Sequence, residues 1–176
     1  IGIAIAILIT EVKNIKLKKL YQSAILLPFL MSMVILSYIV YALLSAENGL
    51  VNNSILPLFH MDPIQWYQKP KYWPAILIIA NCWKGVGYGC LIYIASLIGI
   101  DPSFYEAARL DGASKWQEIT KITLPSLVPT IITLLLLSIG RIFYSDFGLF
   151  YQVPMNSGVL VSTTNVIDTY VYRALI

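Results

Sequence analysis

Histidine and charged residues are scarce in this chain of 176 residues. Only 12% of the residues are charged, and His60 is the single histidine. A nucleophile activated by histidine, or a zinc site built from histidine and cysteine, therefore has little material to draw on. We expect His60 to be a solvated loop residue, and we predict no catalytic residue, no metal site and no cofactor.

Cysteine is also rare, with Cys82 and Cys90 in one apolar run. A helix rises about 1.5 Å per residue, so eight residues separate the two thiols by roughly 12 Å along the axis. A disulfide needs Cα atoms within about 7 Å of each other. We predict two free thiols.

Apolar residues make up 58% of the chain, and the mean hydropathy is +0.74. This composition is typical of membrane proteins, in which helices satisfy every backbone polar group internally. The net charge of +3 is small, and the basic residues do not form a stripe interleaved with exposed aromatics. We therefore predict an all-α, polytopic membrane protein with the lipid bilayer, and not nucleic acid, as a partner.

Four apolar stretches are predicted membrane spans, since about 20 apolar residues cross the roughly 30 Å of hydrocarbon. They are residues 1–9, 24–44, 73–100 and 127–150. The first is too short to span and reads as the tail of a span cut off upstream, so we expect a fragment of a longer chain. Pro28 falls in the first turn of the second span, where proline is tolerated.

Lysine and arginine are divided unequally between the connecting segments. The four spans create two internal and two external segments, and we count seven basic residues inside and three outside. Those inside are Lys13, Lys16, Lys18, Lys19, Arg109, Lys115 and Lys121, and those outside are Lys69, Lys71 and Arg173. Because cytoplasmic loops carry an excess of positive charge, this count places residues 101–126 in the cytoplasm.

The internal segment 101–126 is polar between two apolar runs and predicts a first short helix. Asp101 is a good N-cap residue, and Pro102 suits the first helical position because its missing N–H would have no partner there. We expect this helix to run from about Pro102 to Leu110. Gly112 can adopt the left-handed conformation that closes a helix.

A second helix is predicted directly after the turn. Ser114 followed by Gln117 fits a capping box, in which the side chain of each residue bonds to the backbone of the other. Proline disfavours helical geometry in the residue before it, so we expect the second helix to end before Pro125.

This segment resembles the EAA loop of membrane permease subunits in binding-protein-dependent ABC importers. The motif residues are Glu106-Ala107-Ala108, Asp111-Gly112-Ala113, Ile122, Leu124 and Pro125. Segments outside the loop look like the branch of the family that imports oligosaccharides, namely Trp83-Lys84-Gly85-Val86-Gly87, Ile98-Gly99-Ile100-Asp101-Pro102, Leu137-Ser138-Ile139-Gly140 and residues 166–173.

The resemblance implies a fold, a location and a set of partners. The fold is that of a type I importer transmembrane domain with roughly six spans, in a bacterial plasma membrane. The partners are an ABC ATPase dimer, a second homologous permease subunit, an extracellular solute-binding protein and a sugar. Because the chain has no G-x-x-x-x-G-K-S/T phosphate loop, ATP hydrolysis belongs to a partner and the chain is no enzyme.

In the resembled family the EAA loop docks on the ATPase and passes its closure to the membrane helices. The resemblance implies this coupling role for the residues that match the motif, which are Glu106, Ala107, Ala108, Asp111, Gly112, Ala113, Leu124 and Pro125. Small residues let backbones approach closely, and the carboxylates can pair with basic residues of a partner. The simpler interpretation is a capped helical hairpin on the membrane surface with Glu106 solvated.

A second group of residues is a candidate lining of the translocation path, because aromatic faces stack on sugar rings and polar groups bond hydroxyls. It comprises Trp83, Lys84, Tyr88, Arg141 and Tyr144. Lys84 lies near the predicted bilayer centre, where a charge is costly unless it faces protein or water. Snorkelling, or a structural hydrogen bond to another helix, is the alternative for Lys84. Gly85 and Gly89 have the spacing of a close helix packing motif.

Three functions remain open from the sequence. The first is a permease subunit of an oligosaccharide importer. The second is an ABC permease for another solute, such as glycerol phosphate or an amino acid. The third is an ion-coupled carrier that needs no ATPase and would transport by itself.

Overall fold

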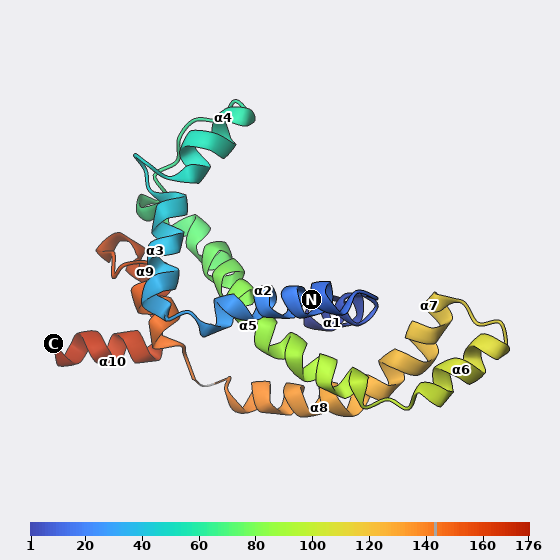
Figure 1. Cartoon of the computed structure of the whole chain (residues 1–176). Helices are drawn as coiled ribbons and strands as arrows, with labels where there is room; N and C mark the ends of the chain where they lie inside the picture. The colour runs from blue at the N-terminus through green and yellow to red at the C-terminus, as the bar shows by residue number, and fades with distance from the viewer. Residues whose placement is uncertain (143) are drawn as a thin grey trace. The chain divides into compact units, whose positions relative to one another are not determined.

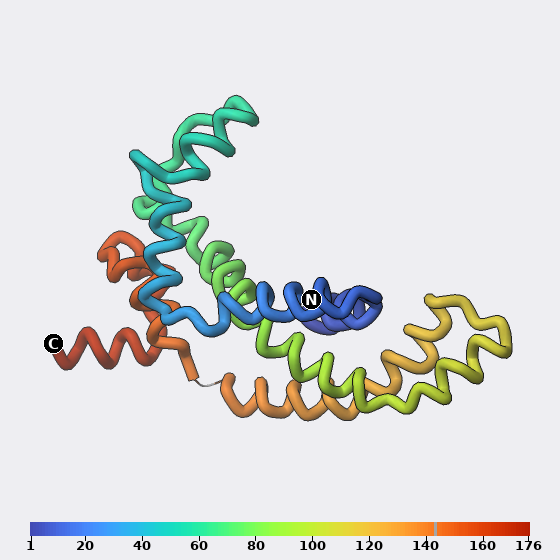
Figure 2. Tube along the Cα trace, viewed as in Figure 1, coloured from blue at the N-terminus to red at the C-terminus, as the bar shows by residue number. Residues whose placement is uncertain are grey.

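The computed structural model describes residues 1–142 and 144–176, and within these residues the regular structure is helical (Figure 1). The chain divides into two compact units. The first unit comprises Ile1–Phe29 and Gly85–Ile142, and the second comprises Leu30–Lys84 and Phe143–Ile176. Each unit is therefore built from two separate pieces of the chain, which Figure 2 lets the reader follow by colour.

The longer helices are α1 (Gly2–Thr10), α2 (Ile15–Leu30), α3 (Met33–Leu44), α5 (Trp73–Ile98), α6 (Pro102–Leu110), α8 (Leu124–Gly140) and α10 (Ile167–Leu175). Shorter α-helical pieces are α4 (Leu56–Leu58), α7 (Lys115–Glu118) and α9 (Val161–Thr164). Three segments are π-helical, η1 (Val51–Ile55), η4 (Ile119–Thr123) and η5 (Gly148–Gln152), and three are 3₁₀ turns, η2 (Trp66–Gln68), η3 (Pro70–Tyr72) and η6 (Gly158–Leu160).

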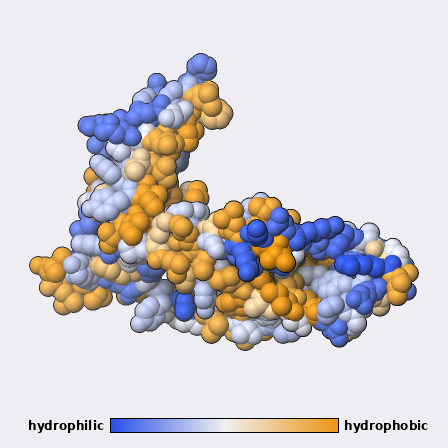
Figure 3. All heavy atoms as spheres, in the orientation of Figure 1, coloured by the Kyte–Doolittle hydropathy of each residue, from blue (hydrophilic) through white to orange (hydrophobic). Residues whose placement is uncertain are grey.

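Two of the described helices are long and apolar enough to cross a membrane. They are Pro70–Ile98, which contains α5, and Lys115–Gly140, which contains α7, η4 and α8; a third candidate arises if α2 and α3 form one broken span. Leu135, Leu136 and Leu137 on α8 are 54–61% exposed. Figure 3 shows hydrophobic side chains over much of the visible surface, as expected where lipid is the solvent.

The break between α2 and α3 differs from the sequence prediction. Helix α2 begins at Ile15, so Pro28 lies inside the helix and its predicted place in a first turn is wrong. Proline removes one backbone hydrogen bond and its ring crowds the preceding turn. The helix ends at Leu30, and Ser32 caps α3 by accepting a hydrogen bond from the Ile35 N–H at 3.3 Å.

The second helix of the polar segment does not end before Pro125, so that prediction is also wrong. Residues Lys115–Gly140 run on as one helix through η4. In η4 the turn widens, and the Leu124 N–H bonds to the Ile119 carbonyl, five residues back. A wider turn is a known way of accommodating a proline inside a helix, because it relieves the crowding ahead of the ring.

Each unit has its own apolar core. In the second unit the buried residues are Leu36, Val40, Trp73, Leu77, Ala80, Leu149, Val153 and Leu160. In the first unit they are Ala6, Ile9, Cys90 and Ile94. The predicted close packing at Gly85 and Gly89 is not found among the described residues, since a Cβ at either position meets nothing within 4 Å. Close packing occurs at Gly87 instead, where an added Cβ would collide with the Ile25 carbonyl oxygen.

Candidate coupling site

Helix α6 begins at a side-chain cap. The Asp101 carboxylate accepts a hydrogen bond from the Ser103 N–H at 2.9 Å, and Pro102 follows at the first helical position. This backbone hydrogen bond holds the pKa of Asp101 below its ordinary value. The helix extends from Pro102 to Leu110, as the sequence predicts.

The turn between α6 and α7 depends on Gly112, whose φ is +77°. A left-handed residue at this position lets the backbone close the helix, and here the Ala113 N–H bonds to the Ala108 carbonyl at 2.9 Å. Ser114 and Gln117 then form the predicted capping box, in which the Gln117 Oε1 accepts from the Ser114 N–H at 2.7 Å. The turn is therefore held at both ends by local bonds.

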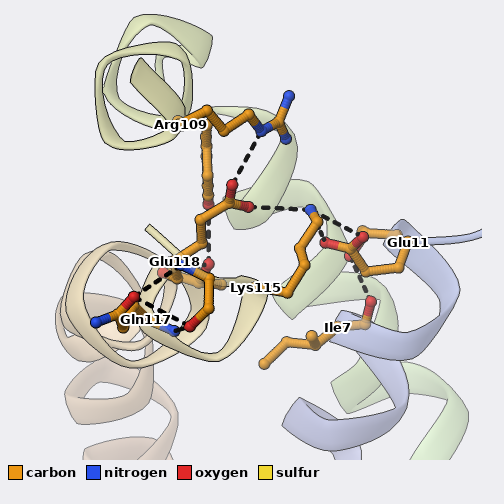
Figure 4. Close-up of polar contacts among 10 residues, drawn as sticks. Ile7, Glu11, Arg109, Lys115, Gln117 and Glu118 are labelled. Carbon is orange, nitrogen blue, oxygen red and sulfur yellow. Dashed lines mark hydrogen bonds and ion pairs between the residues drawn. The ribbon is translucent and has the colours of Figure 1, made fainter. Parts of the chain in front are cut away.

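Glu118 joins the two helices of the loop (Figure 4). Its side chain is 4% exposed, and its carboxylate lies 2.9 Å from the Arg109 Nε and 3.0 Å from the Lys115 Nζ. Hydrogen bonds from these two cations lower the pKa of Glu118 below its ordinary value. The same contacts raise the pKa of Arg109 and of Lys115, so all three groups are charged at neutral pH.

The network also reaches the end of α1. The Lys115 Nζ lies 3.1 Å from the Glu11 Oε2, and Glu11 follows directly after α1 (Figure 4). Both side chains are about half exposed, at 56% for Lys115 and 50% for Glu11. The polar loop is thus linked to an element about a hundred residues earlier in the chain.

The predicted coupling residues differ in exposure. Glu106, Ala107, Asp111, Gly112 and Pro125 are exposed, whereas Ala108, Ala113 and Leu124 are half-buried. A pocket of about 360 Å³ brings together four of them with three neighbours, and its lining is Ala108, Asp111, Gly112, Ala113, Gln117, Lys121 and Ile122. A Cβ on Gly112 would meet nothing within 4 Å, so the turn is open on this side.

Three apolar residues of the loop were not singled out from the sequence. Leu110 is 89% exposed, Trp116 is 72% exposed and Phe104 is 61% exposed. Large apolar side chains on a polar segment between spans are a signal that could have drawn attention to them. The acidic and basic members of the Glu118 network were also missed, because their pairing depends on the fold of the turn.

The predicted path residues are divided between the two units of the chain. Trp83, Lys84 and Tyr144 belong to the second unit, whereas Tyr88 and Arg141 belong to the first. Tyr88 stacks on Phe29 with ring centroids 5.0 Å apart. Lys84 donates a hydrogen bond to the Met31 carbonyl at the break between α2 and α3, which supports the structural alternative for this residue.

The family of the chain follows from its match over residues 2–153 to the binding-protein-dependent transport system inner membrane component family. The chain belongs to this family. It is thus an inner membrane permease component of a binding-protein-dependent ABC transporter, and this class is not catalytic.

Two of the similar proteins have names that state a saccharide. The polygalacturonan/rhamnogalacturonan transport system permease protein YteP of Bacillus subtilis (strain 168) is 32% identical over 99% of this chain and 53% of its own length. The lactose transport system permease protein LacF of Rhizobium radiobacter is 32% identical over 95% of this chain and 56% of its own. The chain spans about half the length of the curated relatives it matches.

The fold agrees with solved structures. A bacterial ABC transporter involved in the import of the acidic polysaccharide alginate matches with a TM-score of 0.90 and 36% identity, covering 98% of this chain and 59% of that one. A second structure, of a bacterial alginate transporter in complex with a periplasmic protein bound to an alginate pentasaccharide, matches with a TM-score of 0.89. The predicted importer fold is confirmed.

Proposed function

We propose that the protein containing this chain is a permease subunit of an ATP-driven oligosaccharide importer, and that residues 101–126 couple it to a cytoplasmic ATPase. The observation that carries the proposal is the capped helical loop with an exposed motif face. On α6, Glu106, Ala107 and Leu110 are exposed, and residues spaced by three or four share one face of a helix.

This face has the chemistry of a docking surface. Ala107 lets a partner backbone come close, Leu110 offers apolar area, and the Glu106 carboxylate can pair with an arginine or lysine of the partner. A helical hairpin that only faces solvent would explain the exposed Glu106. It would not explain why Leu110, a large apolar residue, is 89% exposed. The docking interpretation accounts for both residues.

The geometry also offers a route by which movement of the loop reaches the membrane. Helix α7 continues without interruption through η4 into α8, and α6 follows α5 after three residues. Glu118 holds α6 and α7 together, so the loop can move as one body. Closure of a bound ATPase would then displace the ends of α5 and α8 together.

Carbohydrate is the substrate class that the relatives favour. The similar permeases are described as transporting polygalacturonan and rhamnogalacturonan, lactose, galactooligosaccharides, and maltose and maltodextrin. The alternatives are an ABC permease for glycerol phosphate or an amino acid and, less favoured for a member of this family, an ion-coupled carrier.

The test is transport by the full-length permease, reconstituted in liposomes with its second permease, ATPase and solute-binding protein. We expect uptake of an oligosaccharide that requires ATP and the binding protein. Uptake of glycerol phosphate or an amino acid, with no sugar carried, would contradict the substrate class. Uptake by the permease alone, driven by an ion gradient, would contradict the importer itself.

A further inference from the structure

A polar pocket lies within the second unit, between the end of α3 and the segment around η2. Its volume is about 250 Å³, and its lining residues are Tyr41, Ser45, Ala46, Glu47, Gln65, Tyr67 and Gln68. We call it the loop pocket. This volume is below the roughly 300–1,000 Å³ of most ligand pockets, so the loop pocket suits one sugar unit and not a longer stretch of a glycan.

Asn52 fixes the two walls of the loop pocket relative to each other. Its side chain is buried, and its amide donates to the Ser45 carbonyl at 3.3 Å and to the Ile64 carbonyl at 2.9 Å. Its oxygen accepts from the Ile64 N–H at 3.2 Å and from the Trp66 Nε1 at 2.9 Å. One wall contains Ser45, and the other follows Ile64 directly. A buried, fully bonded amide therefore preorganises the pocket.

Aromatic rings form one side of the loop pocket. The Tyr41 ring meets the Tyr67 ring edge to face at 5.7 Å, and Tyr67 meets Trp73 in the same way at 5.0 Å. Trp73 is in turn anchored by a hydrogen bond from its Nε1 to the Trp66 carbonyl at 2.9 Å. Tyr41 is 45% exposed, so its ring is available to a ligand.

The side chain of Tyr67 carries an unsatisfied hydrogen-bonding group. Its hydroxyl is buried and has no hydrogen-bond partner among the described residues. Burial raises the pKa of Tyr67, so the phenol remains a protonated donor. A buried polar group without a partner costs free energy, and a ligand hydroxyl in the pocket can satisfy it once the Tyr67 side chain shifts toward the pocket.

The polar lining favours neutral over acidic ligands. Glu47 is a carboxylate, which accepts hydrogen bonds from sugar hydroxyls, and Gln65 and Gln68 both donate and accept. The described lining includes no lysine or arginine, although Lys69 follows Gln68 in the chain. A sugar acid would bring its own carboxylate beside Glu47, and like charges at close range repel.

We propose that the loop pocket is a subsite for an uncharged pyranose unit of the incoming oligosaccharide, with Tyr41 stacking on the ring and Glu47 accepting from its hydroxyls. The proposal rests on the proposed function and narrows its substrate class. It separates this chain from relatives and structures that carry acidic polysaccharides. An interfacial aromatic belt would explain Tyr41, but it would not gather a carboxylate and two amides around the ring.

The experiment uses the full-length importer, reconstituted with its partner subunits, and pairs of trisaccharides that differ in oxidation at C6. The pairs are galactotriose with trigalacturonate, mannotriose with trimannuronate, and maltotriose with its glucuronate counterpart. The variants are Glu47→Gln and Tyr41→Ala. Tyr38→Ala is the matched control, because Tyr38 is 64% exposed on the same helix and does not line the loop pocket.

We expect wild type to carry the neutral member of at least one pair in preference to the acidic member. Tyr41→Ala should raise the KM for that sugar by about fivefold at unchanged maximal rate, as for the loss of one aromatic contact. Glu47→Gln should weaken the discrimination against the acidic member, and Tyr38→Ala should change neither quantity.

Preference of wild type for the acidic member, or an unchanged KM in both pocket variants, would overturn the subsite while leaving sugar import intact. Uptake of a different solute with none of the sugars carried would overturn the proposed function, and the subsite with it. The two failures are therefore distinguishable in one assay.

Discussion

Lys115 lies between Glu11 and Glu118, with its Nζ 3.1 Å from the Glu11 Oε2 and 3.0 Å from the Glu118 Oε2. One ammonium therefore joins the end of α1 to the loop between α6 and α8. The two contacts differ in kind, because the Glu118 side chain is 4% exposed and that of Glu11 is 50% exposed. The inner contact lies within α7 and helps to orient Glu118, whose other oxygen holds Arg109 of α6, and the outer contact attaches α7 to α1.

Removing each acidic partner should therefore have different effects. Glu11→Gln should lower the free energy of unfolding by less than about 1 kcal/mol, because exposed ion pairs contribute little. Glu118→Ala should accelerate amide hydrogen exchange across residues 102–118, because Arg109 loses its contact with α7. Amide hydrogen exchange of the full-length permease measures the small loss of stability in Glu11→Gln and the faster exchange in Glu118→Ala. Equal exchange in the two variants would contradict this division of roles.

The loop should lose protection in acid. The pKa of Glu118 is held below its ordinary value of 4.5, so its contribution to stability is complete above pH 4.5 and is lost as the pH falls through the lowered pKa. The pKa of Lys115 is raised above 10.5, so its contribution is complete below pH 10.5 and is lost above the raised value. Amide exchange rates of the loop, corrected for their intrinsic pH dependence, measure the loss of protection in acid and in alkali. Glu118→Gln should weaken the acid transition and leave the part that the lowered pKa of Asp101 contributes. An acid transition as large as that of wild type would contradict this assignment.

Gly112 should tolerate asparagine better than valine. Its φ of +77° strains a residue with a Cβ by roughly 1–2 kcal/mol, although a Cβ there meets no neighbour within 4 Å. Asparagine adopts this conformation more readily than other non-glycine residues. Thermal unfolding of Gly112→Asn and Gly112→Val should therefore show a smaller loss for asparagine. Equal stability of wild type and Gly112→Val would mean that the left-handed turn is not required.

Measurements of stability and of transport can distinguish the roles of two predicted path residues, Lys84 and Tyr144. Lys84→Ala removes a donor to the Met31 carbonyl, and the loss of one part-buried hydrogen bond should lower the stability by about 1 kcal/mol. Tyr144 is 84% exposed, so Tyr144→Ala should leave stability unchanged and reduce transport if it lines the path. Thermal unfolding and uptake measured side by side distinguish the roles. Unchanged uptake in both variants would rule out a path role for both residues.

Local signals made much of the loop predictable from the sequence. The bounds of α6, the left-handed Gly112 and the capping box of Ser114 each depend on a few adjacent residues. The continuation of the helix past Pro125 could not be predicted in this way, because a widened turn removes the expected conflict without a sequence signature.

Contacts between distant residues were beyond the sequence analysis. The pairing of Lys115 with Glu11, and the bonds of Asn52 to both walls of the loop pocket, join residues that only the fold brings together. The early start of α2 was missed for another reason. Charged residues 16, 18 and 19 excluded its first turns from the apolar stretch, although lysine is a good helix former.

The most direct test of the coupling role is recovery of the ATPase with the full-length permease, purified in mild detergent. We compare wild type with Ala107→Trp, which adds bulk to the exposed motif face of α6, and with Ala174→Trp as a matched control, since Ala174 is exposed on α10. We predict that the ATPase and its sugar-stimulated activity are retained in wild type and in Ala174→Trp and are lost in Ala107→Trp. Full retention of the ATPase and of its stimulation in Ala107→Trp would contradict the claim that this loop is the docking element.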